Sequence, residues 1–372
     1  MAVGAGSREY TVVLPERPRP RAEILLAAAS TAVFLILLVA AEALLRVRDS
    51  PAAGILALHR YSETYGWEPR PGARILQSGK PVSVNRAGYR GPELPLRGDG
   101  RETRLLLLGD SIAFGLEVGD QDTFAYRLHA EPGFEVVNLA VDGYGPDQSL
   151  LKLEREGLRF APDVVIMNVC LENDFADAVS ESFLHDGSHP KPYFRLRGDD
   201  LVLHDGHLKL AGRERLGLRL RERSRLFAAL ASALDRKPDP VHWLDRREAA
   251  LRDPQAEALT VALVARMRAL ARSHGAEFVV ALHPGRDTFR RRSRWSKAFQ
   301  RAPPLAGARV VDLRAEYLSR GLGAGDVVMD HVGHLTVGGH RAAAEILSRM
   351  LRAQGLDALR SPAVEAPPDH VG

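Results

Sequence analysis

The chain has 372 residues, 45% hydrophobic and 26% charged, with a formal net charge of +4, which suits one large globular domain or two small ones. Its arginines are scattered among acidic residues, so the charge indicates a solvated surface and argues against nucleic acid as a partner. The single cysteine, Cys170, excludes an intrachain disulfide and a cysteine-based metal site.

An apolar segment dominates the N-terminal part of the chain. Residues 1–22 are polar and proline-punctuated, and we expect them to be disordered. Ile24–Ala41 then runs for 18 residues without a charge, close to the about 20 that cross a bilayer. The segment lacks the polar stripe of a buried amphipathic helix. We therefore predict a single transmembrane helix over residues 23–45, through which the chain contacts a membrane.

A cleaved signal peptide is the alternative for this segment. Ala41–Ala43 has the small-x-small form of a cleavage site, but the region before the apolar run is long for a signal peptide. Arginines flank both sides: Arg17, Arg19 and Arg21 before it, Arg46 and Arg48 after it. We favour an N-terminus inside, which places the rest of the chain outside the cytoplasm.

Residues 46–111 contain a lead-in segment followed by one predicted buried strand. Residues 46–100 are rich in Gly, Pro and Arg, and we expect an extended lead-in with a short strand and turn near Val82–Pro92. The run Arg104–Leu108 contains four consecutive leucines. A continuous apolar run is typical of a parallel strand covered on both faces. Gly109-Asp-Ser111 follows, where open α/β sheets place their ligands.

The strand–loop–helix pattern continues after Ser111. The sequence predicts strands at Phe134–Val141 and Val164–Val169, each followed by a loop and a helix. Three such units favour a doubly wound parallel sheet. An insertion over about 180–250 interrupts the pattern with a hairpin, Tyr193–His204, and arginine-rich helices. Insertions beside a site commonly shape the choice of substrate.

The pattern resumes towards the C-terminus. We predict a helix over Pro254–His274, strands at Glu277–Leu282 and Ala308–Leu313, and a last helix over Arg341–Ala353. The predicted domain therefore covers residues 101–358, and residues 359–372 form a proline-rich tail that we expect to be disordered.

Polar residues follow several of the predicted strands. Ser111, Gly143 and Asn173 come after three of them, and Asp330 and His334 precede the last helix. A serine hydroxyl is a weak nucleophile until a base takes its proton, and histidine has a suitable pKa. A carboxylate fixes the tautomer of that histidine. The backbone N–H groups of Ser111 and Gly143 and the side-chain amide of Asn173 could donate hydrogen bonds to a developing oxyanion.

These blocks, in this order, resemble the SGNH/GDSL hydrolase superfamily over about residues 101–355. The resemblance implies a three-layer α/β/α, flavodoxin-like domain with a central parallel sheet. It also implies that Ser111 is the nucleophile, His334 the base and Asp330 the acid that orients it. The oxyanion hole would consist of Ser111, Gly143 and Asn173. Neither a metal nor a cofactor is expected.

The chain departs from the family pattern at two positions. Leu171 stands where the third block usually has glycine, and Asp330 lies four residues before His334 rather than three. His331 is a rival for the base. We prefer His334 because the residues after it match the family's lead into the last helix, where His340 then belongs to the first turn.

Other polar residues have simpler interpretations. Asp110 makes loop hydrogen bonds, because no second aspartate follows to make a phosphatase motif. Cys170 is a small buried hydrophobe. His283 follows a strand end, which makes it a candidate for lining the site. Gly115 begins no phosphate loop, since no Gly-Lys-Ser/Thr follows. The insertion histidines lack ligand spacing and are expected to be solvated: His185, His189, His204 and His207.

The sequence therefore predicts a membrane-anchored serine esterase that acts outside the cytoplasm. The resemblance implies an ester-bearing small molecule or glycan as substrate, with O-acetyl groups of a cell-surface glycan as the first expectation. An O-acyltransferase using the same site is the near alternative. A non-catalytic glycan-binding or scaffold module is the alternative of another class, and the complete set of site residues argues against it.

Overall fold

A five-stranded parallel sheet forms the centre of the domain, in the order β11-β10-β7-β5-β6. Its strands are β5 (Thr103–Leu108), β6 (Phe134–Asn138), β7 (Val164–Cys170), β10 (Glu277–His283) and β11 (Arg309–Asp312). The computed structural model describes residues 20–48, 58–77, 79–183, 190–234, 242–291, 294–330 and 332–357. The predicted doubly wound parallel sheet is confirmed, with its flavodoxin-like strand order.

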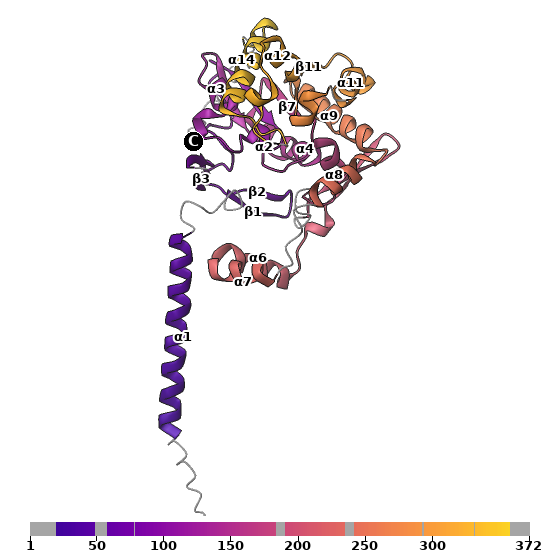
Figure 1. The fold of residues 1–372 in the computed structure, drawn as a ribbon. Helices are drawn as coiled ribbons and strands as arrows, with labels where there is room; N and C mark the ends of the chain where they lie inside the picture. Colours follow the sequence, from indigo (N-terminus) through magenta and orange to yellow (C-terminus); the bar gives the residue numbers. More distant parts are fainter. Residues whose placement is uncertain are drawn as a thin grey trace, which may run out of the picture.

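The four leucines of β5 explain why this strand lies in the middle. Leu106 and Leu108 pack on one face with α4 (Pro146–Arg155) and α9 (Ala256–Ser273). Leu105 and Leu107 pack on the other face with α3 (Phe124–His129) and α14 (Val337–Ala353). Side chains alternate along a strand, so an unbroken apolar run serves two cores at once. The result is three layers, α/β/α (Figure 1).

Shorter elements complete the domain. The helices are α2 (Ser111–Phe114), α5 (Asp174–Val179), α8 (His242–Leu251), α10 (Arg286–Arg290), α11 (Arg294–Arg301), α12 (Leu313–Ser319) and α13 (Ala324–Val327). The 3-10 turns are η2 (Asp120–Asp122), η3 (Gly157–Phe160), η4 (Gly206–Leu208) and η5 (Pro303–Leu305). Most of them connect the strands to the helices of the two outer layers.

The expected extended lead-in fits residues 84–100, which contain neither helix nor strand, but it is wrong for the described residues between 58 and 83. They form two antiparallel hairpins, β1 (His59–Ser62) with β2 (Gly66–Pro69) and β3 (Arg74–Gln77) with β4 (Lys80–Ser83). Tyr65 and Trp67 are buried in the same core as α4 and α9. The hairpins fold onto the domain because they carry large apolar side chains that the core can bury.

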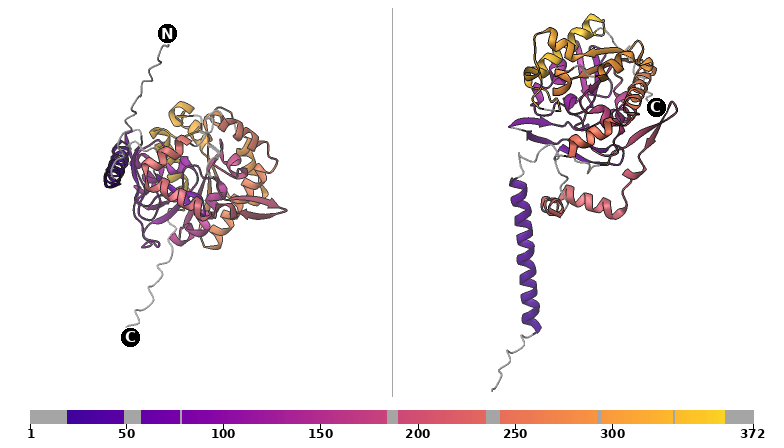
Figure 2. Two further views of the ribbon diagram at one scale, coloured as in Figure 1. Left: turned by 90° about the horizontal axis from the view of Figure 1, so that it is seen from below. Right: turned by 45° about the vertical axis from the view of Figure 1, so that its right-hand side comes forward.

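The insertion divides into two parts. Its predicted hairpin is confirmed as β8 (Tyr193–Arg197) and β9 (Asp200–His204), which turns at Gly198-Asp199. This hairpin and α8 lie against the domain. By contrast, α6 (Gly212–Arg223) and α7 (Arg225–Leu234) lie below it, crosswise beside the upper end of α1 (Figures 1 and 2).

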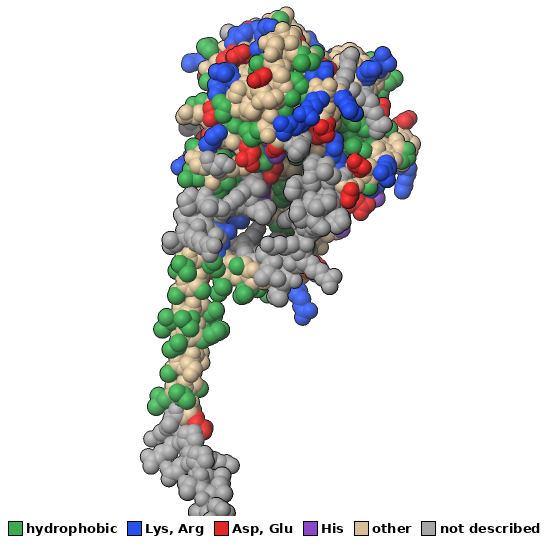
Figure 3. Space-filling view, viewed as in Figure 1, with side chains coloured by type: hydrophobic (Ala, Val, Ile, Leu, Met, Phe, Trp, Pro, Cys, Tyr) green, Lys and Arg blue, Asp and Glu red, His purple; other side chains and the backbone are tan. Residues whose placement is uncertain are grey.

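Helix α1 (Pro20–Arg48) projects from the domain as a single rod (Figures 1 and 2). Glu23–Arg46 is long and apolar enough to cross a membrane, with a mean hydropathy of 2.7 and none of its most apolar window buried. Hydrophobic side chains run along the rod, whereas charged side chains of both signs cover the visible face of the domain (Figure 3). A transmembrane anchor and a signal sequence both have these properties.

The predicted ends of the chain lie largely outside the described residues. Residues 1–19 and 358–372 are not described, but residues 20–22 belong to α1 rather than to a disordered segment. Pro20 fits this position because the first turn of a helix needs no N–H from it. The last helix also begins earlier than predicted, at Val337, since the Thr336 hydroxyl caps it by accepting from Gly339 N at 2.9 Å.

Candidate active site

Ser111 opens helix α2 directly after the central strand β5. Asp110 caps this helix and accepts a hydrogen bond from Ile112 N at 3.0 Å, as expected for a loop aspartate. Gly115 ends the helix in the left-handed conformation after a single turn. The tight turn presents the Ser111 side chain at the carboxyl end of the sheet, where α/β folds bind their ligands.

His334 reaches Ser111 from a loop 223 residues further along the chain. The loop is closed by an antiparallel bridge between Val328 and Leu335 and by the Met329 N–H, which donates to the carbonyl of His334 at 2.9 Å. His334 Nε2 lies 2.9 Å from Ser111 Oγ. This distance allows the hydroxyl to donate its proton to a neutral imidazole.

Asp330 orients the far side of the same imidazole. Its Oδ2 contacts His334 Nδ1, and its Oδ1 accepts from Gly333 N at 2.8 Å and from His334 N at 3.1 Å. The hydrogen-bond network assigns the proton to Nδ1 and leaves Nε2 free to accept. The four-residue spacing therefore still brings the carboxylate to the imidazole, through a turn that Asp330 itself stabilises.

Charge and burial act in opposite directions on this pair. Burial alone would lower the pKa of His334, but its hydrogen bond to Asp330 and the negative charge of Asp330 raise that pKa above its usual value. Burial would raise the pKa of Asp330, and the contact with His334 lowers it instead. The pair is thus built to stabilise an imidazolium.

Gly143 lies in the loop after β6, under an aromatic side chain. Its φ is +75°, and a Cβ at this position would lie 2.5 Å from Cε2 of Phe183. The Phe183 ring packs on Trp67, with 5.4 Å between the ring centroids. Trp67 Nε1 also donates to the carbonyl of Asp142 at 2.9 Å. Phe183 and Trp67 were not predicted, because neither lies near the motifs in sequence.

Asn173 ends the loop after β7 and precedes helix α5. Its Nδ2 donates to Asp177 Oδ2 at 2.7 Å and lies 3.4 Å from Asp110 Oδ2. Its Oδ1 is buried and has no partner within the described part of the chain. These two contacts orient the N–H₂ group of the amide towards the carboxylates of Asp110 and Asp177. The Asn173–Asp177 spacing of four residues is the one sequence signal that could have identified Asp177.

Asp177 belongs to a buried group of carboxylates behind the site. Burial raises its pKa to about 7, against the opposing effects of Lys191 and Asn173. Lys191 is fully buried and pairs with Asp147 at the start of α4. The Lys191 ammonium group, which comes from the insertion, therefore opposes the effect of burial on the pKa of both Asp147 and Asp177.

The structure separates the other histidines from this constellation. His283 does not line the site, which corrects the prediction: it is fully buried, with Nε2 3.0 Å from Asn168 Oδ1. Burial lowers its pKa to about 3. His340 lies in the first turn of α14, as predicted, and accepts from Phe124 N at 3.2 Å. His331, the rival base, lies outside the described residues.

The remaining predictions concern isolated residues. Cys170 is buried, as predicted. His204 and His207 are exposed; His204 stacks on Tyr193, and His207 Nε2 lies 3.0 Å from the carbonyl of Lys191. His185 and His189 fall outside the described ranges. Across the residues that the structure does describe, no cluster of three His, Cys, Asp or Glu could hold a metal ion.

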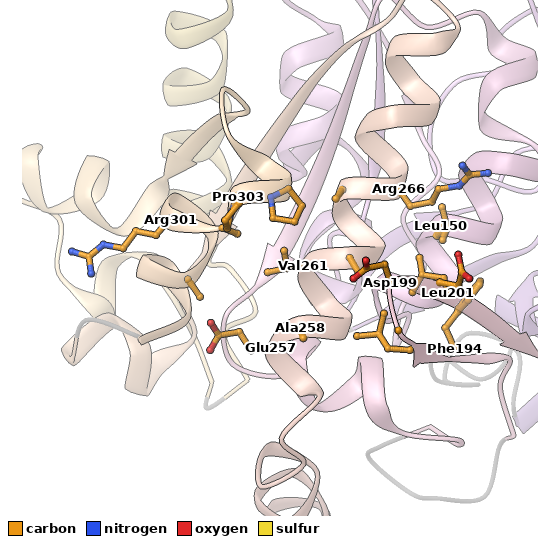
Figure 4. Close-up of a pocket in the computed structure, with 18 of the residues that line it drawn as sticks. Leu150, Phe194, Asp199, Leu201, Glu257, Ala258, Val261, Arg266, Arg301 and Pro303 are labelled. Atoms are coloured by element: carbon orange, nitrogen blue, oxygen red, sulfur yellow. The ribbon is translucent and has the colours of Figure 1, made fainter.

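A hollow lies elsewhere on the domain. It has a volume of about 1470 Å³ and lies beside α9, with Phe194 and Leu201 of the β8–β9 hairpin on one side and Pro303 on the other (Figure 4). Ser111 and His334 are not among its lining residues. Ser111 and His334 therefore lie outside this hollow.

The arrangement defines a serine hydrolase of the α/β/α type, and sequence comparison agrees. The GDSL-like Lipase/Acylhydrolase family matches residues 107–342, so the chain belongs to this family and is an enzyme that acts on ester bonds. No curated protein matches the chain.

Several solved structures of hydrolases are similar to the chain at low identity. A G-D-S-L family lipolytic protein from Desulfitobacterium hafniense is 14% identical over 67% of this chain and 100% of its own, with a TM-score of 0.37. A catalytic mutant of the acetylxylan esterase Axe2 from Geobacillus stearothermophilus is 15% identical over 71% of this chain and 99% of its own, with a TM-score of 0.38.

Proposed function

We propose that this enzyme is a serine esterase in which Ser111 is the nucleophile, His334 the base and Asp330 the acid that orients it. The observation that carries the proposal is the 2.9 Å contact between Ser111 Oγ and His334 Nε2. The contact between His334 Nδ1 and Asp330 supports it, because it fixes the tautomer that can accept the serine proton.

The geometry supports a two-step reaction. Ser111 Oγ attacks the ester carbonyl while its proton moves to His334 Nε2, and the carbonyl oxygen becomes an oxyanion. The N–H groups of Ser111 and Gly143 donate to that oxyanion, and the Asn173 amide joins them by giving up its long, 3.4 Å contact with Asp110 Oδ2. The tetrahedral intermediate collapses, His334 gives its proton to the leaving alcohol, and an acyl-serine remains. Water then attacks the acyl-serine with His334 as base, which releases the acid and restores Ser111.

We propose a short acyl group, acetyl first, on a polar substrate such as a cell-surface glycan. Phe183 supports the short acyl group, because its ring fills the space beside Gly143, one of the proposed oxyanion donors. Trp67 packs behind that ring.

We further propose that α1 is a single-pass anchor and that the catalytic domain lies outside the cytoplasm. The length and apolar character of Glu23–Arg46 support the anchor. The three arginines at positions 17, 19 and 21, against two at positions 46 and 48, favour an N-terminus inside.

The test compares the full chain in detergent with Ser111→Ala. The substrate is p-nitrophenyl acetate, and both the burst and the steady-state release of p-nitrophenol are measured. The proposal expects Ser111→Ala to lose at least about 10³-fold in kcat while circular dichroism stays unchanged. Ser319→Ala is the matched control, because this hydroxyl lies in α12 and donates only to the carbonyl of Glu316, at 2.8 Å.

The form of the progress curve separates the alternatives. Fast steady turnover supports the esterase. A burst followed by slow turnover indicates an acyl-enzyme that waits for a sugar hydroxyl, which favours the O-acyltransferase. Equal release by wild type and Ser111→Ala contradicts the catalytic assignment and favours a binding or scaffold role.

A further inference from the structure

Two helices of the insertion lie at the end of the proposed membrane anchor. In both side views, α6 and α7 lie crosswise to α1 and beside its upper end, below the body of the domain (Figures 1 and 2). If α1 stands across a bilayer, α6 and α7 lie along the surface of that bilayer. The following inference rests on the anchor proposed above.

Specific hydrogen bonds fix this placement. The Glu42 carboxylate in α1 accepts from Arg225 N at 3.0 Å and from Leu226 N at 2.9 Å, and so caps the first turn of α7. Arg46 Nη2 donates to the carbonyl of Arg223, the last residue of α6, at 2.7 Å. Two side chains one turn apart in α1 therefore bind backbone groups at the end of α6 and at the start of α7. These contacts hold the α6–α7 hairpin beside the Glu42–Arg46 turn of α1.

The side chains of the hairpin have the composition of a membrane-surface segment. Its sequence in α6, GRERLGLRLRER, has five arginines against two glutamates, and in α7, RLFAALASAL, it has one charge. Leu216 and Leu220 are four residues apart on one side of α6 and are 57% and 40% exposed. Leu230 of α7 is 57% exposed.

Exposure of these leucine side chains to water is unfavourable, whereas their burial at a bilayer surface is favourable. Leucine side chains enter the boundary between headgroups and acyl chains, while arginines extend their stems along it and hold their charge at lipid phosphates. Each Lys or Arg of a cationic segment at the surface adds to its attraction for anionic lipid headgroups. The hairpin is bound to α1 at Glu42 and Arg46, near the end of the apolar stretch Glu23–Arg46, which places it at the surface of the same bilayer.

We propose that the α6–α7 hairpin is a lipid-binding surface for anionic phospholipid headgroups. The hairpin then gives the catalytic domain a second contact with the membrane, in addition to the anchor α1. The domain is then held at a fixed height and orientation instead of turning freely about α1.

The test places an environment-sensitive fluorophore on the hairpin of the full chain. Cys170 is buried and is the only native cysteine, so maleimide chemistry can address Leu230→Cys. The protein is reconstituted in nanodiscs of phosphatidylcholine with phosphatidylglycerol, and quenching by headgroup-labelled nitroxide lipid is measured. Leu318→Cys in α12 is the matched control, because Leu318 is 45% exposed and α12 lies at the far end of the domain (Figure 1).

Several-fold stronger quenching at position 230 than at position 318 is expected, and equal quenching overturns the proposal. A second label at Leu216→Cys gives the same comparison if Leu230→Cys fails to fold. Replacing phosphatidylglycerol by phosphatidylcholine, or introducing Arg213→Gln with Arg219→Gln, should lower the quenching at position 230. Quenching that is unchanged by both contradicts recognition of anionic headgroups.

Two further measurements keep the proposals apart. Alkaline washing of membranes tests the anchor, and Ser111-dependent release of p-nitrophenol tests the esterase. A chain that stays in washed membranes and remains active but is not quenched at position 230 overturns the lipid-binding surface alone. Release of the chain by washing contradicts the anchor, and the lipid-binding surface falls with it.

Discussion

His334 combines burial with a carboxylate partner, and its protonation should control the reaction. Since Asp330 raises the pKa of His334 above its usual value of about 6.5, the acid limb of kcat/KM for the free enzyme should lie above pH 6.5. Below that pKa the imidazole is already protonated and cannot accept the Ser111 proton. The pH profile of p-nitrophenyl acetate hydrolysis measures this limb directly.

Asp330→Asn should change both the rate and the pH profile. The amide keeps the shape of the side chain but not its charge, so burial lowers the pKa of His334 and the acid limb moves to lower pH. The wrong tautomer is also stabilised, and kcat should fall by about 10³–10⁴-fold. An acid limb that coincides with that of the wild type would show that Asp330 does not set the pKa of the base.

The amide of Asn173 should contribute to the transition state rather than to substrate binding. Asn173→Ala is expected to lower kcat by about 10²–10³-fold with KM changed only a few-fold. Asp177 accepts from the same amide at 2.7 Å and acts as a positioning residue. Asp177→Ala should therefore lower kcat, and Asp177→Asn, whose carbonyl oxygen still accepts, should restore most of it. Equal losses in both Asp177 variants would indicate a general effect on folding instead.

At the scale of elements, the turn at Gly143 is expected to tolerate no side chain. The φ values of +75° at Gly143 and +61° at Gly198 impose a similar backbone cost on alanine, about 1–2 kcal/mol. A Cβ at position 143 also lies 2.5 Å from Phe183, whereas at position 198 nothing lies within 4 Å. Gly143→Ala should thus destabilise more than Gly198→Ala, and it alone should lower kcat.

Denaturant unfolding and p-nitrophenyl acetate turnover measure the two effects separately. Adding Phe183→Ala to Gly143→Ala should recover the part of the stability lost to the side-chain contact, while the cost of the positive φ remains. Equal midpoints and equal turnover in the two glycine variants would argue against a close contact between Phe183 and this turn.

Elements that carry a local signal could be predicted from the sequence. The leucine run of β5 identifies a strand buried on both faces, and the order of the motifs after successive strands places Ser111 and His334 at one edge of the sheet. Asp330 lies four residues before His334 rather than three, and the sequence alone did not show whether its carboxylate could still reach the imidazole. The turn that makes this possible depends on hydrogen bonds from the backbone N–H groups of Gly333 and His334 to Asp330 Oδ1.

Contacts between distant segments could not be predicted in the same way. Trp67 and Phe183 pack together although they lie 116 positions apart in the sequence, and Lys191 pairs with Asp147 inside the protein. No periodicity connects such residues, since each lies in a segment with its own local pattern. The hairpins before residue 100 were missed for this reason: their glycines and prolines indicate turns, but their large side chains find a core that other segments supply.

At the scale of the whole molecule, buried histidines should make folding sensitive to acid. His283 lies between the sheet and the ring of Phe124, and burial lowers its pKa to about 3. The unfolded chain binds a proton near pH 6.5 and the folded chain does not, so this residue costs stability as the pH falls from about 6.5 towards 3.

His283→Gln removes this effect while keeping a donor for Asn168. The wild type should lose up to about 1.4 kcal/mol of its free energy of unfolding per pH unit relative to the variant over that range. Denaturant unfolding of both proteins at several pH values measures the difference. A difference that does not change with pH would show that His283 is able to take up a proton in the folded protein.

The long separation between Ser111 and His334 has a consequence for the synthesis of the protein. The base is made 223 residues after the nucleophile, which at about 5–20 residues per second is a delay of roughly 10–45 seconds. A chain whose synthesis has not yet reached His334, or one cut short before that residue, carries the serine without the imidazole that activates it. On the proposed assignment, the enzyme becomes reactive only when its domain is nearly finished, so incomplete copies do not attack esters.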